Sequence, residues 1–426
     1  MSAEAAPLPT AKAIAVAASA VALEGYDLTI YGLFAVTIAH AFFPARDATS
    51  SLLMAVGTLG VGYVVRPIGG VILGAYADRA GRKPAIALTV LLMSLSTGII
   101  GLIPGESTIG LAAPILVVLA RLAQGFAAGG AVSGTISYLA ETAPPGRRGF
   151  YASWQQTSWI GAFLLSAGIG AVITNTLSPH QLAEWGWRIP FLLAFLFGPL
   201  GLYIKSHLPE PEAYIKAAKH FRSESVGRAI LRNRNAVLIG FGLTCLWNIT
   251  AFILLFYMPT YAQKDLALPA GDAFLSSALS GLLLFILCPL VGRLSDRVGR
   301  KAPMLLSALC LMLFTYPIYL LIDLERTFAS LVLAQVILAV FIAGYTAPIP
   351  AMLAELYPTH NRSTGLSVAY NLSTLIVGAF GPFIVTWLIA TTRSSLAPAF
   401  YVAIGALVSV GALVASRDHS LQALEE

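Results

Sequence analysis

Gly74-Ala-Tyr-Ala-Asp78-Arg79-Ala-Gly81-Arg82-Lys83 is the stretch that decides the fold, and it has a second copy at Gly292-Arg-Leu-Ser-Asp296-Arg297-Val-Gly299-Arg300-Lys301. Each copy lies between two long apolar runs, which predicts a tight polar turn that joins two hydrophobic helices. The copies are about half the chain apart. A repeat at that spacing indicates one structural unit used twice.

A second pair of motifs supports the duplication. Leu139-Ala-Glu141 precedes Pro144, Arg148 and Gly149, and Leu353-Ala-Glu355 precedes Pro358, Arg362 and Gly365. Two independent motifs recur in the same order, so chance similarity is a poor explanation.

Composition places the chain in a membrane. Only 11% of its 426 residues are charged, 57% are apolar, and the mean hydropathy is +0.79. Soluble proteins carry about 25% charged residues. About 20 apolar residues cross a bilayer as a helix. The apolar pattern predicts twelve spans, at 13–39, 52–76, 85–104, 111–140, 151–174, 188–206, 236–262, 273–292, 302–322, 328–355, 363–391 and 397–415.

The predicted fold is an all-α polytopic membrane protein with two six-helix bundles. We expect an N-terminal bundle at 1–206, a cytoplasmic linker at 207–235 and a C-terminal bundle at 236–426. Parallel duplication of this kind places a pseudo-twofold axis along the membrane normal and a pathway between the halves.

The net charge of +6 has two possible explanations. It could bind nucleic acid, but most cations fall on the side of the repeated turns and the linker. The positive-inside rule then puts both termini and the linker in the cytoplasm. We therefore expect the lipid bilayer as partner and no nucleic acid. The first span is expected to stay uncleaved, because no convincing signal-peptidase site precedes it.

Several function classes are disfavoured. Cys245, Cys288 and Cys310 lie in apolar stretches without metal-ligand spacing, so we expect neither a metal nor a cofactor. The chain has no P-loop for an ATP-driven pump, and it lacks the His-Glu-x-x-His and Gly-x-Ser-x-Gly motifs of hydrolases. A channel or a substrate sensor stays open as an alternative to a transporter.

The repeated turns resemble the cytoplasmic signature of the major facilitator superfamily. Arg121-x-x-Gln124-Gly125 resembles the helix-4 motif of its proton-coupled members. Finer motifs resemble the metabolite–proton symporter branch, namely Glu24-x-x-Asp27-x-x-x-Tyr31-Gly32, Arg66-Pro67-x-Gly69, Gly149-Phe150-Tyr151-x-Ser153-x-Gln155 and the run from Glu184 to Phe191.

Within that branch the chain looks most like the citrate and tricarballylate symporters. Phe42-Phe43-Pro44, Gly74-Ala75-Tyr76, Ser153-Trp154-Gln155 and the run from Thr108 to Pro114 carry this likeness. The resemblance implies proton-coupled symport in the inner membrane. Ala131 departs from the pattern, because many relatives have a carboxylate there, so neither proton stoichiometry nor substrate choice carries over intact.

Four charged residues fall inside predicted spans: Glu24, Asp27, Arg66 and Arg121. An embedded charge costs about 2.5–3.5 kcal/mol on insertion scales, so such residues usually face a cavity and a partner. We predict Asp27 and Glu24 as proton-coupling groups, with structural pairing to an arginine as the alternative. Arg66 lies about 18 Å before the turn, near mid-membrane. It could clamp a carboxylate or pair with Asp27.

Uncharged polar residues complete the candidate substrate site. With Arg66 and Arg121, we predict Tyr31, Gln124, Gln155, Asn248, Tyr345, Tyr370 and Asn371 as substrate-binding residues. Each could instead bond a neighbouring helix for about 0.6 kcal/mol.

The repeated turns are predicted to form a cytoplasmic gate that is closed when the cavity opens outward. Its expected residues are Gly74, Asp78, Arg79, Gly81, Arg82, Glu141, Asp296, Arg297, Arg300 and Glu355. Glu141 and Glu355 are the expected partners of the arginines.

We expect a monomeric, non-enzymatic, proton-coupled symporter of an organic anion that works by alternating access. A tricarboxylate such as citrate or tricarballylate is the first expectation. A zwitterionic osmolyte such as proline or betaine, or a dicarboxylate, is the alternative.

Overall fold

The computed structural model describes residues 10–43, 48–220 and 226–420. All regular elements in these ranges are helices. The N-terminal half contains α1 (Thr10–Leu33), α2 (Ala35–Phe42), α3 (Ala48–Ala80), α4 (Arg82–Leu102), α5 (Glu106–Ile109), α6 (Ala112–Thr142), α7 (Arg148–Thr176), α8 (Pro179–Gln181), η1 (Leu182–Gly186), α9 (Arg188–Leu193), η2 (Ala194–Leu196) and α10 (Phe197–His207).

Two short helices, α11 (Glu212–His220) and α12 (Val226–Arg232), lie in the predicted linker. The C-terminal half contains α13 (Arg234–Ala251), η3 (Phe252–Tyr257), α14 (Met258–Lys264), α15 (Ala270–Val298), α16 (Lys301–Glu325), α17 (Phe328–Thr346), α18 (Ile349–Glu355), η4 (Thr359–Asn361), α19 (Arg362–Ser373), η5 (Thr374–Ala379), α20 (Gly381–Thr392) and α21 (Ala397–Ala415).

The described helices agree with a twelve-span architecture. Ten are long and apolar enough to cross a membrane, and the pair α1 and α2, bent by 70°, makes an eleventh candidate. The eleventh predicted span, 363–391, is helical through α19, η5 and α20 but begins with a polar stretch rich in Ser, Thr and Asn. A polar helix of this kind is tolerated in a membrane where it faces protein, and most of α19 is buried.

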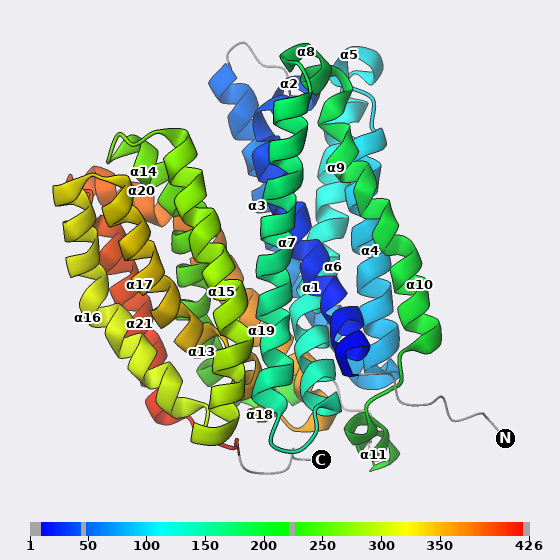
Figure 1. The fold of residues 1–426 in the computed structure, drawn as a ribbon. Coiled ribbons are helices and arrows are strands. Elements are labelled where there is room, and N and C mark those ends of the chain that lie inside the picture. Colours follow the sequence, from blue (N-terminus) through cyan, green and yellow to red (C-terminus); the bar gives the residue numbers. More distant parts are fainter. Residues whose placement is uncertain (1–9, 44–47, 221–225, 421–426) are drawn as a thin grey trace.

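The two halves form two groups of helices that meet at one end of the molecule (Figure 1). We call this the linker end, because α11 lies there. At this end α3 packs against α19, and α7 packs against α15 and α18. Toward the opposite end the ribbons of the two groups diverge (Figure 1).

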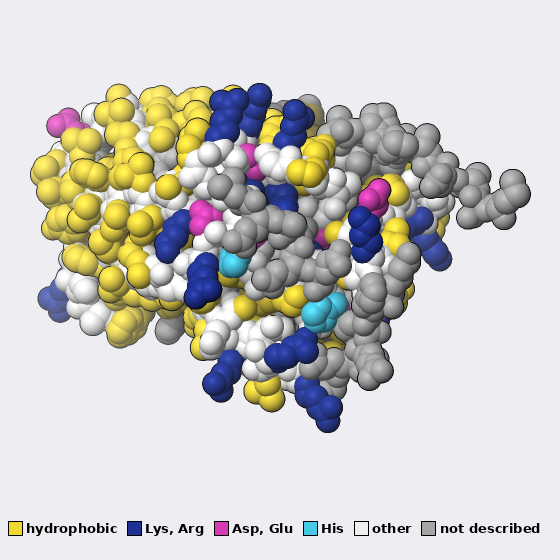
Figure 2. Space-filling model, turned by 90° about the horizontal axis from the view of Figure 1, so that it is seen from below, with side chains coloured by type: hydrophobic (Ala, Val, Ile, Leu, Met, Phe, Trp, Pro, Cys, Tyr) yellow, Lys and Arg dark blue, Asp and Glu magenta, His cyan; other side chains and the backbone are white. Residues whose placement is uncertain are grey.

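The predicted tight turns are present. Gly81 has φ +116° and is the N-cap of α4, and Gly299 has φ +90° and is the C-cap of α15. Side chains other than hydrogen rarely tolerate such φ values, so both turns depend on glycine. Seen from the linker end, the surface carries many more Lys and Arg than Asp and Glu side chains (Figure 2). This distribution agrees with the charge asymmetry expected from the sequence.

Candidate functional site

A cavity with about 620 Å³ of empty space, part of it open to solvent, lies between the two halves. It is lined from the N-terminal half by Glu24, Leu28, Tyr63, Arg66, Gln155, Gln156 and Trp159, and from the C-terminal half by Trp247, Asn248, Ala251, Phe252, Tyr370, Thr374 and Gly378. We call it the central cavity. Because both halves contribute walls, any relative movement of the halves reshapes this space.

Glu24 and Arg66 form a buried ion pair in the wall of the central cavity. Arg66 Nη2 lies 2.5 Å from Glu24 Oε1, and both side chains are about 95% buried. The other carboxylate oxygen, Oε2, and Arg66 Nε have no hydrogen-bond partner among the described residues. The pair is therefore held by one contact and keeps a free acceptor and a free donor.

The partner of Asp27 is Arg121 and not Arg66, which the sequence analysis considered. Its carboxylate accepts from Arg121 Nη1 at 2.7 Å, from Gln124 Nε2 at 2.7 Å and from Thr97 Oγ1 at 3.0 Å. Arg66 thus pairs with Glu24, and Asp27 pairs with Arg121. The spacing of Glu24 and Asp27 placed them on one face of α1, but it could not assign which arginine each would meet.

The Asp27 cluster surrounds a smaller cavity inside the N-terminal half, which we call the annex. Glu24, Leu28, Tyr63 and Arg66 line both spaces. Tyr31 forms part of the same cluster, since the Arg121 guanidinium lies 3.5 Å from the centre of its ring. Tyr31, Arg121 and Gln124 therefore contact Asp27 or one another and do not line the central cavity.

The uncharged candidates divide into two groups. Gln155, Asn248 and Tyr370 line the central cavity, and Gln155 Oε1 is buried without a hydrogen-bond partner. Tyr345 instead donates to the Leu243 carbonyl at 2.7 Å. Asn371 donates to the Gly129 carbonyl of the other half at 2.8 Å. These last two side chains make interhelical bonds outside the cavity lining.

The predicted substrate-binding residues did not include Gln156, Tyr63, Trp159 or Trp247, which all line the central cavity. In the structure Trp247 Nε1 donates to Gln156 Oε1 at 2.9 Å, which links the halves across the central cavity. The Trp247 ring also lies 5.2 Å from that of Tyr370. Aromatic residues are common in membrane helices, so their composition gave no signal that separates cavity walls from lipid contacts.

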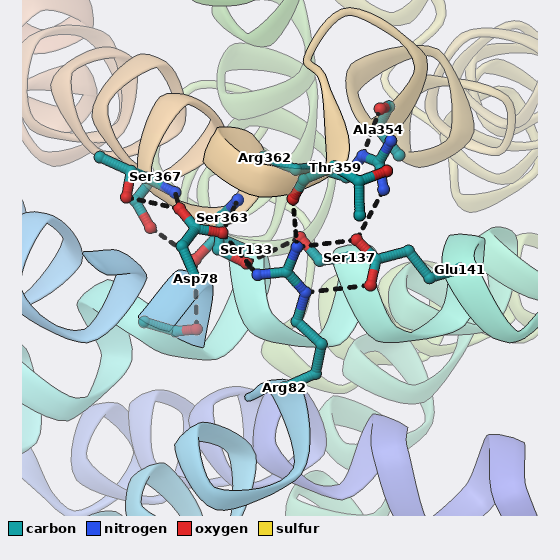
Figure 3. A network of polar contacts seen from close by, with 12 residues as sticks. Asp78, Arg82, Ser133, Ser137, Glu141, Ala354, Thr359, Arg362, Ser363 and Ser367 are labelled. Atoms are coloured by element: carbon teal, nitrogen blue, oxygen red, sulfur yellow. Dashed lines mark hydrogen bonds and ion pairs between the residues drawn. The ribbon is translucent and has the colours of Figure 1, made fainter. Parts of the chain in front are cut away.

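Asp78, Arg82 and Glu141 form a buried cluster at the linker end (Figure 3). Arg82 binds Glu141 through two hydrogen bonds of 2.8 and 3.0 Å and binds Asp78 at 2.5 Å. Arg362, from the other half, also reaches Glu141 at 2.6 Å. The predicted partnership of Arg82 with Glu141 is confirmed, and a cation from α19 joins it.

Serine pairs extend this contact along α6 and α19 (Figure 3). Ser363 donates to Ser137 at 2.9 Å, and Ser367 donates to Ser133 at 2.5 Å. Asn371 and Gly129 continue the series one turn further, toward the central cavity. Small residues let the two helices approach closely enough for these bonds.

The second copy of the motif forms an equivalent cluster. Asp296 accepts from the Gly149 and Phe150 amides at 2.7 and 2.9 Å, and from Arg300 at 2.7 Å. Glu355 accepts from Arg148 at 3.3 Å and from Arg300 at 3.4 Å. These distances are longer than those around Glu141, so the second cluster is the looser of the two.

Two carboxylates brace the repeated turns from outside. Glu210, three residues after α10, accepts from the Arg82 and Lys83 amides at 3.0 and 3.1 Å. Asp418, three residues after α21, accepts from the Arg300 and Lys301 amides at 2.9 and 3.0 Å. Each therefore caps the helix that follows a turn, and their matching positions reflect the duplication.

The pKa values of the two capping carboxyl groups are shifted in opposite directions. Partial burial raises the pKa of Glu210, and its amide hydrogen bonds offset this only in part. Burial also acts to raise the pKa of Asp418, but hydrogen bonds from Lys301, Ser420 and Arg300 outweigh it, so its pKa lies below the ordinary value.

Comparison with known proteins places this arrangement in a family. The pattern of the Major Facilitator Superfamily matches residues 17–329 and 289–423. The chain belongs to the Major Facilitator Superfamily. The family expected from the repeated turns is thus confirmed.

Members of the superfamily that resemble the chain fall into two substrate groups. The citrate-proton symporter of Salmonella typhi is 35% identical over 92% of this chain and 90% of its own length. The proline/betaine transporter of Escherichia coli K12 is 33% identical over 94% of this chain and 82% of its own length. Because the two sequence identities are similar, they do not indicate which of the two groups shares its substrate class with this chain.

Solved structures of superfamily members share the fold. The proton:xylose symporter XylE bound to 6-bromo-6-deoxy-D-glucose superposes with a TM-score of 0.85, covers 98% of each chain and is 18% identical. The inward-open form of XylE from E. coli gives a TM-score of 0.68.

Proposed function

We propose that the protein is a secondary active transporter of the inner membrane that carries a small carboxylate-bearing metabolite together with protons. The observation that carries this proposal is the Glu24–Arg66 ion pair in the wall of the central cavity. A guanidinium with a free donor can bind a substrate carboxylate, and a buried carboxyl beside it can bind a proton. Catalysis and a cofactor have no part in this function.

The linker end corresponds to the cytoplasm in this proposal, because Lys and Arg gather there (Figure 2). Both chain termini are then cytoplasmic. The buried clusters around Glu141 and Glu355 join the two halves on this side, which supports their role as a cytoplasmic gate that is closed in an outward-facing form. A monomer alternates to an inward-facing form when these clusters open, and a ligand shifts the equilibrium only by its differential affinity.

A tricarboxylate such as citrate is the first candidate substrate. Citrate-proton symporters are among the similar proteins. Arg66 supplies one cation to the central cavity, and the amide of Gln155 can donate a hydrogen bond to a further carboxylate, whereas the Asn248 amide already donates to the Thr244 carbonyl and to Ser373.

A zwitterionic osmolyte is the second candidate, and the charge of the cavity favours it. The central cavity contains one cation, Arg66, and one anion, Glu24. Its walls carry the aromatic side chains of Tyr63, Trp159, Trp247, Phe252 and Tyr370. Aromatic faces bind quaternary ammonium groups well, whereas three carboxylates would find only one guanidinium.

Uptake by purified protein in proteoliposomes tests both candidates. Labelled citrate and labelled glycine betaine are offered separately, and unlabelled citrate, tricarballylate, dicarboxylates, proline and betaine compete. We expect accumulation of one labelled compound and inhibition by its own chemical class. Arg66→Lys should raise the apparent Kd of that compound, because Lys cannot form paired hydrogen bonds. Passage of all compounds down their gradients alone would favour a channel and overturn the proposal.

A further inference from the structure

The two buried ion pairs of the N-terminal half differ in how completely their carboxylates are bonded. Both oxygens of Asp27 are occupied, by Arg121 Nη1, Gln124 Nε2 and Thr97 Oγ1. Glu24 has one hydrogen bond, from Arg66 Nη2 to Oε1, and its Oε2 has none among the described residues. Both carboxylate oxygens of Asp27 are thus bonded, whereas Glu24 has one oxygen that can accept another partner.

The two pairs also differ in location. Glu24 and Arg66 line the central cavity, where a substrate between the halves would contact them. Asp27 and Arg121 line only the annex within the N-terminal half. A substrate carboxylate can bind Arg66 by replacing one hydrogen bond, the one from Arg66 to Glu24. It would reach Arg121 only by breaking the bonded cluster around Asp27.

We propose that Glu24 is the proton-coupling carboxyl. When Glu24 takes up a proton, a substrate carboxylate replaces Glu24 as the partner of Arg66. This inference rests on the proposed function. Asp27 then acts as a positioning residue, which keeps Arg121 and α6 in place without exchanging its own partner.

Charge balance gives the reason for coupling. Ionised Glu24 and Arg66 sum to zero. A substrate carboxylate on Arg66 beside an ionised Glu24 would leave two negative charges against one positive in a space of low dielectric. One proton from the outer solution binds Glu24 Oε2, the Glu24–Arg66 contact breaks, and Arg66 binds the substrate carboxylate. Counted over Glu24, Arg66 and the single substrate carboxylate that Arg66 binds, the charge is zero before and after, and no covalent bond other than O–H forms.

The groups that face Glu24 are consistent with this exchange. Its charged neighbours are Arg66 from α3 and Asp27 on its own helix, and its titratable neighbours include Tyr63 from α3 and Tyr370 from α19. Arg121 from α6 shares the annex with it. The cavity residues from α7 and α13 are uncharged. Among the described residues, Arg66 is therefore the one cation in the lining of the central cavity, and Glu24 and the substrate must compete for it.

Substrate binding to detergent-purified protein at several pH values tests the exchange. The probe is whichever of citrate or glycine betaine the uptake assay selects. In wild type the apparent Kd should rise about tenfold per pH unit above the pKa of Glu24, with about one proton taken up per bound ligand in unbuffered solution. Glu24→Gln mimics the protonated carboxyl, so we expect a Kd independent of pH and no proton uptake.

Three further variants separate coupling from folding. Glu24→Asp keeps a titratable group and should keep proton uptake. Asp27→Asn should keep it too, but with a lower melting temperature, because Arg121 loses its buried partner. Glu184→Gln makes the same chemical change at an exposed side chain and should behave as wild type.

Two results overturn the exchange. One is proton uptake that persists in Glu24→Gln, and the other is proton uptake that is lost in Asp27→Asn although this variant still binds the probe. Wild-type protein that accumulates neither probe would overturn the proposed function itself, and the exchange with it. Wild-type accumulation together with unchanged proton uptake in Glu24→Gln overturns the exchange alone.

Discussion

Asp78 and Thr364 lie in different halves of the molecule and are joined by two hydrogen bonds. The Thr364 backbone amide and hydroxyl both donate to Asp78 Oδ2, at 2.8 and 2.6 Å, and the Ser363 amide donates to Oδ1 at 3.1 Å. The carboxylate at the end of α3 thus caps the start of α19. Asp296 does the same for α7 from the opposite half. The duplicated motif therefore makes two reciprocal contacts that hold the linker end closed.

Asp78→Asn should weaken this closure. Charge-assisted hydrogen bonds contribute about 2 kcal/mol each, so loss of one corresponds to a roughly thirtyfold shift toward the form open at the linker end. Spin labels at exposed Lys205 and Arg417, one in each half, would report the change as a longer distance. Asp323→Asn, at a more exposed pair with Arg326, is the matched control. An unchanged distance distribution in Asp78→Asn would contradict the closing role.

The two clusters at the linker end should differ in strength. Arg82 is fully buried and binds Glu141, Asp78, Ser363 and the Thr359 carbonyl. Removing one partner of a buried ion pair costs about 3–5 kcal/mol. We expect Arg82→Ala to lower the melting temperature more than Arg300→Ala, whose contacts to Glu355 are longer. An equal decrease in melting temperature in both variants, or a larger decrease in Arg300→Ala, would show that the hydrogen-bond distances do not predict which cluster is stronger.

The cap at Asp418 should depend on pH. Its pKa is lower in the folded protein than in the unfolded chain, so the folded state gains stability above the unfolded pKa of about 3.9. That gain is lost as the pH falls through the folded pKa. Loss of such a cap costs about 1 kcal/mol. Asp418→Ala should therefore lower the melting temperature at pH 7 and have a smaller effect near pH 3. A difference in melting temperature between wild type and Asp418→Ala that grows as the pH falls would contradict the capping role of ionised Asp418.

Trp247→Leu separates the two substrate classes. A cation over an aromatic face gains up to about 2 kcal/mol when desolvated, so a quaternary ammonium substrate should lose roughly tenfold or more in affinity. A tricarboxylate should lose less, because its charge contacts Arg66. Competition by betaine and citrate against the labelled substrate measures both, with Leu238→Ala, at an exposed position, as the control. Unchanged betaine affinity in a betaine-transporting protein would exclude the aromatic wall as its ammonium site.

The sequence predicted the fold well because its signals are local or repeated. Apolar runs set the spans, and glycines at positive φ set the turns at Gly81 and Gly299. The partners of Arg82 and Arg300 also followed, since Glu141 and Glu355 recur at matching positions in the two halves.

Pairing within the site could not be predicted in the same way. Glu24 and Asp27 share a face of α1, but the choice between Arg66 and Arg121 depends on how α3 and α6 pack against it. Asn371 was expected near substrate, and it bonds Gly129 instead, because α19 lies close to α6. The contribution of Gln156 arises only where α7 meets Trp247 of the other half. Such contacts depend on the distance between helices, which periodicity does not encode.

Accumulation driven by an imposed proton gradient tests the central claim most directly. Proteoliposomes at high internal pH are diluted into low external pH, and the internal concentration of labelled citrate or glycine betaine is followed with and without a protonophore. The account predicts that wild-type protein concentrates one of these compounds above its external level, that the protonophore abolishes this, and that Glu24→Gln only equilibrates it. Accumulation that ignores the protonophore, or that Glu24→Gln performs as well as wild type, would contradict the account.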